Sequence, residues 1–451
     1  MKKLRFLLVL LACKVISFVV PLLRKNGGSM IAGKIAMKVD KMFIKGFTNI
    51  NYDNVVFVTG SNGKTSATNL ISYCMDVTAK TVATNVEGSN MLGGVATTLI
   101  KNSNIFGRFN KEFLILEIDE RSIQKVYEQL PAKNLCITNI STDQVQRNGD
   151  PDFIYRKISS IVNNNMTLFL NNEEPRSKGL EGKAGKVVYF SVADNAWTSI
   201  KVEDFFNTTL PCPLCCAKIK YLSYNLSNMG KFRCTECDFK SEASPNVVIK
   251  NIDFDNNTIT CDGIKYTVKY SLPYYIYNYA MCIAVCKELG IDSTELREAI
   301  ASFENPLHRR EEIEYNGKTI KYFRMKQENP ETLQNALDTI KMDKNAKAIF
   351  IGLFVIKDFP PAYTNTFYFF DCDVNEIVQG DVEKYVVFSK TVAYDTANRL
   401  IYAGADKSKL VIMDTDDVSK VMEQIDAIET DNIYILTGMK PYKKIKEYFK
   451  S

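Results

Sequence analysis

A glycine-rich loop that contains a lysine is the part of this sequence with the clearest chemistry. It follows the apolar run Val55–Val58, predicted to be a buried strand, and it opens a helical pattern that continues to Met75. Glycines let a backbone approach a phosphate closely, and the amides at a helix N-terminus attract an anion. We therefore predict that a nucleoside triphosphate binds to this loop. The predicted binding residues are Gly60, Ser61, Asn62, Gly63, Lys64, Thr65 and Ser66.

Two residues of the loop and one acidic segment have individual predicted roles. Lys64 is expected to neutralise the β and γ phosphates, and the Thr65 hydroxyl is expected to bind Mg²⁺. The segment Leu116–Glu120 ends another predicted strand with three acids, where a second magnesium ligand is needed. A solvated acidic strand end is the structural alternative for these acids.

Four cysteines form a second group with recognisable chemistry. Cys212 and Cys215 make one C-x-x-C pair, and Cys234 and Cys237 make another after 18 intervening residues. Two thiolate pairs on tight turns predict a tetrahedral Zn²⁺ site with no open position, and such closed sites are structural. Cys216 is an alternative ligand to Cys215, although the spacing favours Cys215. Disulfides are disfavoured because nucleotide chemistry belongs to a reducing compartment.

Length and composition limit what else the chain does. A chain of 451 residues is too long for one hydrophobic core, so two or three domains are predicted. Its 46% apolar and 24% charged residues are typical of a folded protein, and a net charge of +5 does not argue for nucleic acid as a partner. The one histidine is His308, so a Cys–His or Ser–His nucleophile pair within this chain would have to use it.

The pattern along the chain divides it into three regions. Residues 1–50 form an apolar N-terminal helix and a lead-in. Residues 51–305 alternate short strands with helices, which predicts a parallel sheet covered on both faces, and about 205–245 form an insertion that contains the four cysteines. Residues 306–451 alternate again and predict a second α/β domain.

The apolar run from Phe6 to Leu23 could be either an anchor or part of a core. It is interrupted by Lys14 and Ser17, and basic residues flank it on both sides. A helix that packs on the first domain or lies on a membrane surface is favoured over a spanning segment. The chain is expected in the cytoplasm, either free or at the inner face of the cell membrane.

The phosphate loop and its surroundings resemble those of a known family. The form G-x-x-G-K-T is that of the Mur ligases and the folylpolyglutamate synthetases. The resemblance implies that ATP converts a carboxylate to an acyl phosphate, which an amine then attacks. It also implies that Glu117 binds Mg²⁺, that Asn278 holds the nucleotide, and that Arg309 meets ATP.

Three features resemble the MurT-like subgroup of the Mur ligases. They are Thr84-Asn85 with Gly88–Met91, the run Leu116–Glu120, and the four-cysteine insertion. The resemblance implies the synthetase half of a two-chain enzyme. A GatD-like glutaminase would supply ammonia, and this chain would amidate the α-carboxylate of D-glutamate in the stem peptide of lipid II or a related cell-wall precursor.

One departure from the subgroup leaves alternatives open. In the subgroup an acid of the C-terminal region orients the partner's catalytic histidine, but the first aspartate of that motif is Asn365 here. Asp371 is the predicted substitute, with Asp358 as the alternative. The other functions considered are a diverged Mur-type ligase that joins a different amine, a folate- or cyanophycin-type ligase, and a nucleotide-binding scaffold without turnover.

Overall fold

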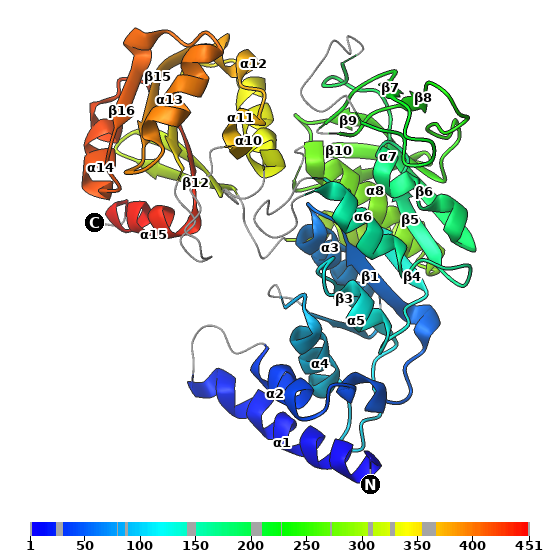
Figure 1. Ribbon diagram of the computed structural model, residues 1–451. Helices are drawn as coiled ribbons and strands as arrows, with labels where there is room; N and C mark the ends of the chain where they lie inside the picture. Colours follow the sequence, from blue (N-terminus) through cyan, green and yellow to red (C-terminus); the bar gives the residue numbers. More distant parts are fainter. Residues whose placement is uncertain are drawn as a thin grey trace. The chain divides into compact units, whose positions relative to one another are not determined.

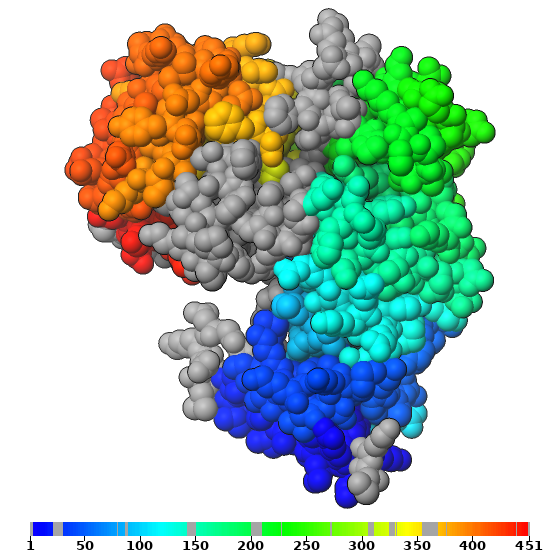
Figure 2. Space-filling model, viewed as in Figure 1, coloured from blue at the N-terminus to red at the C-terminus, as the bar shows by residue number. Residues whose placement is uncertain are grey.

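The computed structural model shows a chain folded into two compact units (Figures 1 and 2). The first unit is formed mainly by residues before 306, and the second contains residues 306–451. The residues described are 2–23, 30–78, 80–85, 89–141, 150–199, 210–226, 228–270, 273–304, 310–324, 330–353 and 367–449.

A nine-stranded sheet forms the centre of the first unit. Its strands are β1 (Val55–Thr59), β2 (Val82–Thr84), β3 (Phe113–Glu117), β4 (Asn134–Ile137), β5 (Thr167–Asn171), β6 (Lys186–Val192), β9 (Val247–Asp253), β10 (Thr258–Cys261) and β11 (Ile264–Thr267). The order is β11-β10-β9-β6-β5-β4-β1-β3-β2. All neighbours from β2 to β9 pair in parallel, and β10 and β11 are added antiparallel at one edge. The predicted parallel sheet is therefore confirmed.

Helices cover both faces of this sheet because its central strands are apolar on both sides. In β1, Val56 and Val58 join the core under one layer of helices, and Val55 and Phe57 join the core under the other. The first layer contains α3 (Lys64–Val77), α8 (Pro273–Glu288) and α9 (Ser293–Ser302). The second contains α1 (Lys2–Leu23), α2 (Ile31–Val39), α4 (Leu92–Lys101), α5 (Ile123–Tyr127) and α6 (Pro151–Ser159).

The N-terminal helix α1 belongs to the first unit and packs on it by one face. Phe6, Leu10 and Cys13 are buried in the same core as α2 and α4. Among the described residues, no helix is both long enough and apolar enough to cross a membrane.

The four-cysteine insertion leaves the sheet after β6 and returns at β9. These two strands pair with each other, so the insertion does not interrupt the order of the sheet. It contains the antiparallel pair β7 (Ile219–Tyr221) and β8 (Phe232–Cys234). Its own core is small, and its buried members are Leu210, Cys212, Ile219, Tyr221, Phe232, Cys234 and Phe239.

The second unit is a separate α/β domain, as predicted. Its six strands are β12 (Arg310–Tyr315), β13 (Lys318–Arg324), β14 (Lys347–Gly352), β15 (Val382–Phe388), β16 (Leu410–Met413) and β17 (Asn432–Thr437), in the order β12-β13-β17-β14-β15-β16. Its helices are α10 (Pro330–Met342), α11 (Phe367–Phe370), α12 (Asn375–Val378), α13 (Ala393–Tyr402), α14 (Val418–Ala427) and α15 (Met439–Tyr448). The strands pair in parallel except for β12 and β13, which form a hairpin.

A candidate nucleotide site and a cluster of four cysteines

The predicted phosphate loop connects β1 to the N-terminus of α3 (Figure 1). Gly60 and Gly63 both have positive φ, at 126° and 81°. A Cβ atom on Gly60 would lie 2.3 Å from Thr138 Oγ1, so only glycine fits there. No described side chain caps the N-terminus of α3, so an anion in the loop would meet the positive end of this helix.

A second segment, at the end of β4, holds the phosphate loop in place. The amides of Ser61 and Asn62 donate to the carbonyl oxygen and the Oδ1 atom of Asn139, at 2.8 Å and 3.0 Å. Ser61 and Ser141 exchange hydrogen bonds at 2.9 Å through the Ser61 hydroxyl. Our sequence reasoning gave Asn139 and Ser141 no role. The structure shows that they hold the backbone of the loop whose residues are predicted to bind the nucleotide.

Lys64 is buried within the loop and is only 7% exposed. Its ammonium donates to Glu120 Oε2 at 3.0 Å, to the carbonyl oxygen of Ser61 at 3.2 Å, and to the carbonyl oxygen of Gly60. A lysine taken out of water needs such partners, because an uncompensated buried charge is costly. Glu120, which is 1% exposed, is one of the three acids of the segment Leu116–Glu120, but its pairing with Lys64 was not predicted.

Glu117 lies at the carboxyl end of β3, in register with Val58 of β1. Its side chain accepts a hydrogen bond from Asn90 Nδ2 at 3.0 Å, and its backbone is held by Asn85 on both the amide and the carbonyl side. The nearby Asp119 has a raised pKa because it is largely buried and lies beside Glu120. Glu117, Asp119 and Glu120 thus form an acidic edge next to the phosphate loop, where a divalent cation would be stabilised.

Asn278 of α8 also reaches this loop. A Cβ atom on Gly63 would lie 3.0 Å from Asn278 Oδ1, so the two residues are neighbours although 215 positions separate them. Asn278 is buried, and its Nδ2 atom has no hydrogen-bond partner among the described residues. A buried amide donor that faces the phosphate loop fits a residue that hydrogen-bonds a ligand.

A buried network fixes the position of α8 and therefore of Asn278. Tyr277 donates to Glu173, and Asn225 Nδ2 donates to Glu173 and to the Tyr277 hydroxyl at 3.1 Å and 3.0 Å. Ser191 adds a hydrogen bond to Glu173 at 2.6 Å. Burial raises the pKa of Glu173, and burial beside Glu173 raises the pKa of Tyr277. Because Asn225 belongs to the insertion, the cysteine-containing segment and the nucleotide-site helix share this network.

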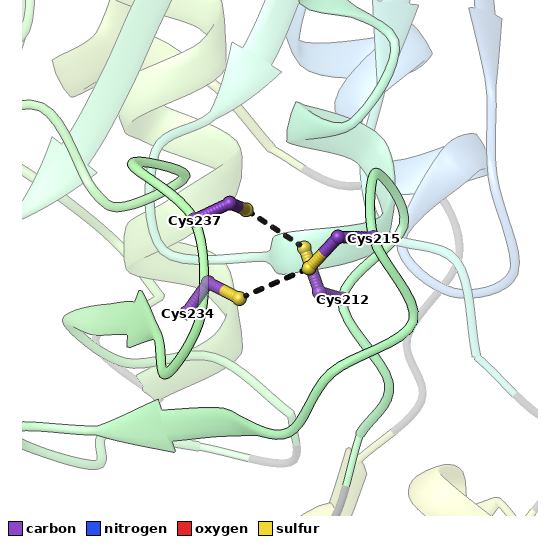
Figure 3. A group of neighbouring side chains, drawn as sticks. All are labelled: Cys212, Cys215, Cys234 and Cys237. Carbon is purple, nitrogen blue, oxygen red and sulfur yellow. Dashed lines mark hydrogen bonds between the residues drawn. The ribbon is translucent and has the colours of Figure 1, made fainter.

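The four predicted metal ligands come together in the insertion (Figure 3). Their Sγ atoms all lie within 4.8 Å of one another, with Cys212 to Cys237 at 3.7 Å and Cys215 to Cys234 at 3.4 Å. Thiolates around a tetrahedral Zn²⁺ lie about 3.8 Å apart, since each Zn–S bond is about 2.3 Å. The geometry therefore suits a zinc ion. Cys216 lies outside the group of four and is exposed, and none of the twelve cysteines, all of which are described, is in a disulfide.

The backbone around Cys234 favours the thiolate form of this residue. The amide of Glu236 donates to Cys234 Sγ at 3.4 Å, and this donor, followed by the amide of Cys237, lowers the pKa of Cys234 to about 6. Amide donors to sulfur are the usual outer contacts of a cysteine metal site.

Four of the predicted site residues belong to the second unit. Arg309, Asn365 and Asp358 lie outside the described residues. Asp371 directly follows α11 and is half-buried, and burial raises the pKa of its carboxyl group.

Two family models match the chain. Residues 58–235 match the Mur ligase middle domain, and residues 327–439 match the MurT ligase C-terminal domain. With the phosphate loop and acidic edge described above, these matches define the class of the protein as a ligase, similar in its middle region to the Mur ligases.

Within that class, the chain is similar to MurT proteins along most of its length. It is 26% identical over 433 residues to the MurT subunit of the glutamine-hydrolysing lipid II isoglutaminyl synthase of Streptococcus pneumoniae, a match that covers 94% of this chain and 93% of the relative. The corresponding subunit of Staphylococcus aureus is 24% identical over 369 residues, which are 80% of each chain.

Solved structures share the fold. A pseudomurein peptide ligase type C from Methanothermus fervidus superposes with a TM-score of 0.68 at 17% identity, covering 90% of this chain and 80% of its own. MurF from Acinetobacter baumannii superposes with a TM-score of 0.63 at 12% identity, covering 92% and 80%. The predicted Mur ligase fold, with a second α/β domain, is confirmed.

Proposed function

We propose that this chain is the synthetase subunit of a lipid II amidating enzyme. It would use ATP to activate the α-carboxylate of D-glutamate in the stem peptide, and ammonia would then give D-isoglutamine. The arrangement of side chains at the phosphate loop supports this proposal most directly. Its buried Lys64, the acidic edge at Glu117 and the unsatisfied amide of Asn278 converge there, in a chain similar to MurT.

The roles of the side chains follow from the charge that the reaction develops. Attack of the substrate carboxylate on the γ-phosphorus would transfer the phosphoryl group, and Lys64 would stabilise its charge. Ammonia would then attack the carbonyl carbon of the acyl phosphate, which forms the amide bond, expels inorganic phosphate and releases a proton. A magnesium ion held by Thr65 and Glu117 would neutralise phosphate charge, and Arg309 would also contact ATP.

The remaining assignments also belong to this proposal. Residues 51–305 would form the ATP-binding domain and 306–451 the C-terminal domain, and the reaction would take place in the cytoplasm. Cys212, Cys215, Cys234 and Cys237 would bind one structural Zn²⁺. Ammonia would come from a GatD-like glutaminase, because a glutaminase normally needs an activated cysteine with a histidine, and the one histidine here is His308 beside Arg309. Asp371 would orient the histidine of that partner, with Asp358 or Asn365 as the alternatives.

The nitrogen source tests this division of labour. Purified chain with lipid II and ATP should form the amide with ammonium chloride at high concentration, because an acyl phosphate needs only a free amine. Glutamine should give no amide until a glutaminase subunit is added. Mass spectrometry of the lipid II product measures both reactions.

Two outcomes would change the proposal. Amidation by the isolated chain with glutamine would contradict the two-chain model. No reaction with ammonia, but ligation of an amino acid, would favour the diverged Mur-type ligase, for which Asn365 in place of the subgroup's aspartate is the motivating observation.

A further inference from the structure

Helix α1 is apolar on two opposite faces, and the described residues cover only one of them. On the covered face, the Phe6 ring lies 5.0 Å from Phe43 and 5.3 Å from Phe47, measured between ring centroids. Lys14 bends back to donate to the carbonyl oxygens of Ile100 and Ser103, at 2.6 Å and 2.5 Å. These contacts fasten α1 to the first unit.

The opposite face of α1 carries a continuous row of exposed large side chains, here called the apolar stripe. Its members are 38% to 73% exposed, and each lies three or four residues from another member, which places them on one side of a helix. They are Leu4, Leu8, Leu11, Val15, Phe18 and Val19. A helix that is apolar on all sides is normally buried on all sides. Among the described residues, nothing covers the apolar stripe of α1, which is the kind of surface that binds a partner.

The surroundings of the stripe are strongly basic. The first 50 residues contain ten Lys or Arg and one Asp, a net charge of +9, whereas residues 51–451 contain 47 basic and 51 acidic residues, a net charge of −4. The chain's overall +5 conceals this contrast. Exposed lysines also lie on α2 and just after it, and α2 packs directly against α1. Lys34, Lys38, Lys41 and Lys45 form no ion pair with any described residue.

A turn on the covered side of α1 also has two exposed apolar side chains. Ile105 and Phe106 are 53% and 69% exposed, and Asn104 Oδ1 fixes their turn by accepting from the amides of Phe106 and Arg108 at 2.9 Å and 3.0 Å. A Cβ atom on Gly107 would lie 2.6 Å from the Phe6 ring, so this turn lies against the covered face of α1.

We propose that the apolar stripe of α1 and its basic surroundings dock on an anionic lipid surface, with α1 lying in the plane of the membrane. Apolar side chains at the level of the headgroups, combined with unpaired cations, are the combination that binds helices to such surfaces. A second copy of the chain is disfavoured as the occupant, because two N-terminal regions that each have a net charge of +9 would repel each other. Figures 1 and 2 show α1 (dark blue) at the outer margin of the first unit.

The inference does not depend on the proposed function, because it concerns no residue of the nucleotide site. Docking by α1 would keep a ligase close to any substrate that carries a lipid. It would not require a spanning segment.

Sedimentation with lipid vesicles tests the proposal. The full chain should bind vesicles of phosphatidylcholine and phosphatidylglycerol in equal parts, and binding should weaken with added salt and on phosphatidylcholine alone. The double variant Leu8→Glu/Phe18→Glu should bind at least about tenfold more weakly, since two apolar side chains that would be buried in the lipid are lost.

The matched control is Tyr394→Glu/Tyr402→Glu, which makes the same charge change at two exposed aromatic residues of α13. This control should bind as the wild type does, and so should Lys64→Ala, whose defect concerns ATP. Failure of the wild type to bind anionic vesicles would overturn the proposal. Equal binding by the Leu8/Phe18 variant would also overturn it, and so would a wild-type dimer that this variant dissociates, in which case a second copy covers the stripe.

Discussion

Replacing Lys64 by alanine should reduce ATP-dependent product formation by about 100-fold or more, because the cation that faces the transferring phosphoryl group is lost. The structure adds a second expected effect. Lys64 is buried and paired with Glu120, so the variant should also lose about 3 kcal/mol of unfolding free energy. Amide formation and thermal unfolding, measured on the same preparation, record the two effects.

A double variant separates these two effects. Lys64→Met/Glu120→Gln removes both buried charges and keeps the aliphatic stem, so it should recover much of the stability and none of the activity. Lys80→Met is the surface control, since Lys80 pairs with Glu112 where the two side chains are 33% and 44% exposed. Full activity in Lys64→Ala would exclude the loop as the phosphate site.

Loss of the cysteine cluster should affect folding more than chemistry. The insertion has a small core of its own, so a bound zinc would supply much of its stability. Protein purified without chelator should contain about one zinc per chain. Cys234→Ser should lose this metal and unfold at a lower temperature, as measured by elemental analysis and calorimetry.

The adjacent cysteine provides a matched control for that experiment. Cys216 is exposed and lies outside the group of four, so Cys216→Ser should keep both the metal and the stability. Equal loss of zinc in the two variants, or a Cys212–Cys237 disulfide in native protein, would contradict a four-thiolate zinc site.

Local patterns in the sequence predicted much of the fold. The runs Val55–Val58, Phe113–Leu116 and Ile433–Leu436 are strands because they are short, β-branched or aromatic, and apolar on both sides. The phosphate loop was predictable for the same reason, since strand, loop and helix are contiguous.

Two hairpins were missed although the sequence signals them. Asn316-Gly317 and Asp262-Gly263 both have positive φ at their two positions, as tight hairpin turns require. They connect β12 to β13 and β10 to β11, which place antiparallel strands at sheet edges. Short polar strands around these turns lack the apolar runs on which the prediction depended.

Other features depend on contacts between distant segments and could not be predicted from one sequence. The pairing of Lys64 with Glu120 and the support of Ser61 by Asn139 each need the sheet order to be known. The apolar composition of α1 was evident in the sequence, but both faces are apolar, so periodicity alone could not say which face packs.

Isotope transfer from the substrate carboxylate tests the central claim most directly. In the proposed reaction one carboxylate oxygen becomes the bridge of an acyl phosphate and leaves with the phosphate when ammonia attacks. Lipid II labelled with ¹⁸O in the D-glutamate α-carboxylate, incubated with this chain, ATP and ammonia, should therefore yield inorganic phosphate that contains ¹⁸O in equal amount to the amide formed. Label in AMP, or amide formed with no label in phosphate, would contradict activation through an acyl phosphate.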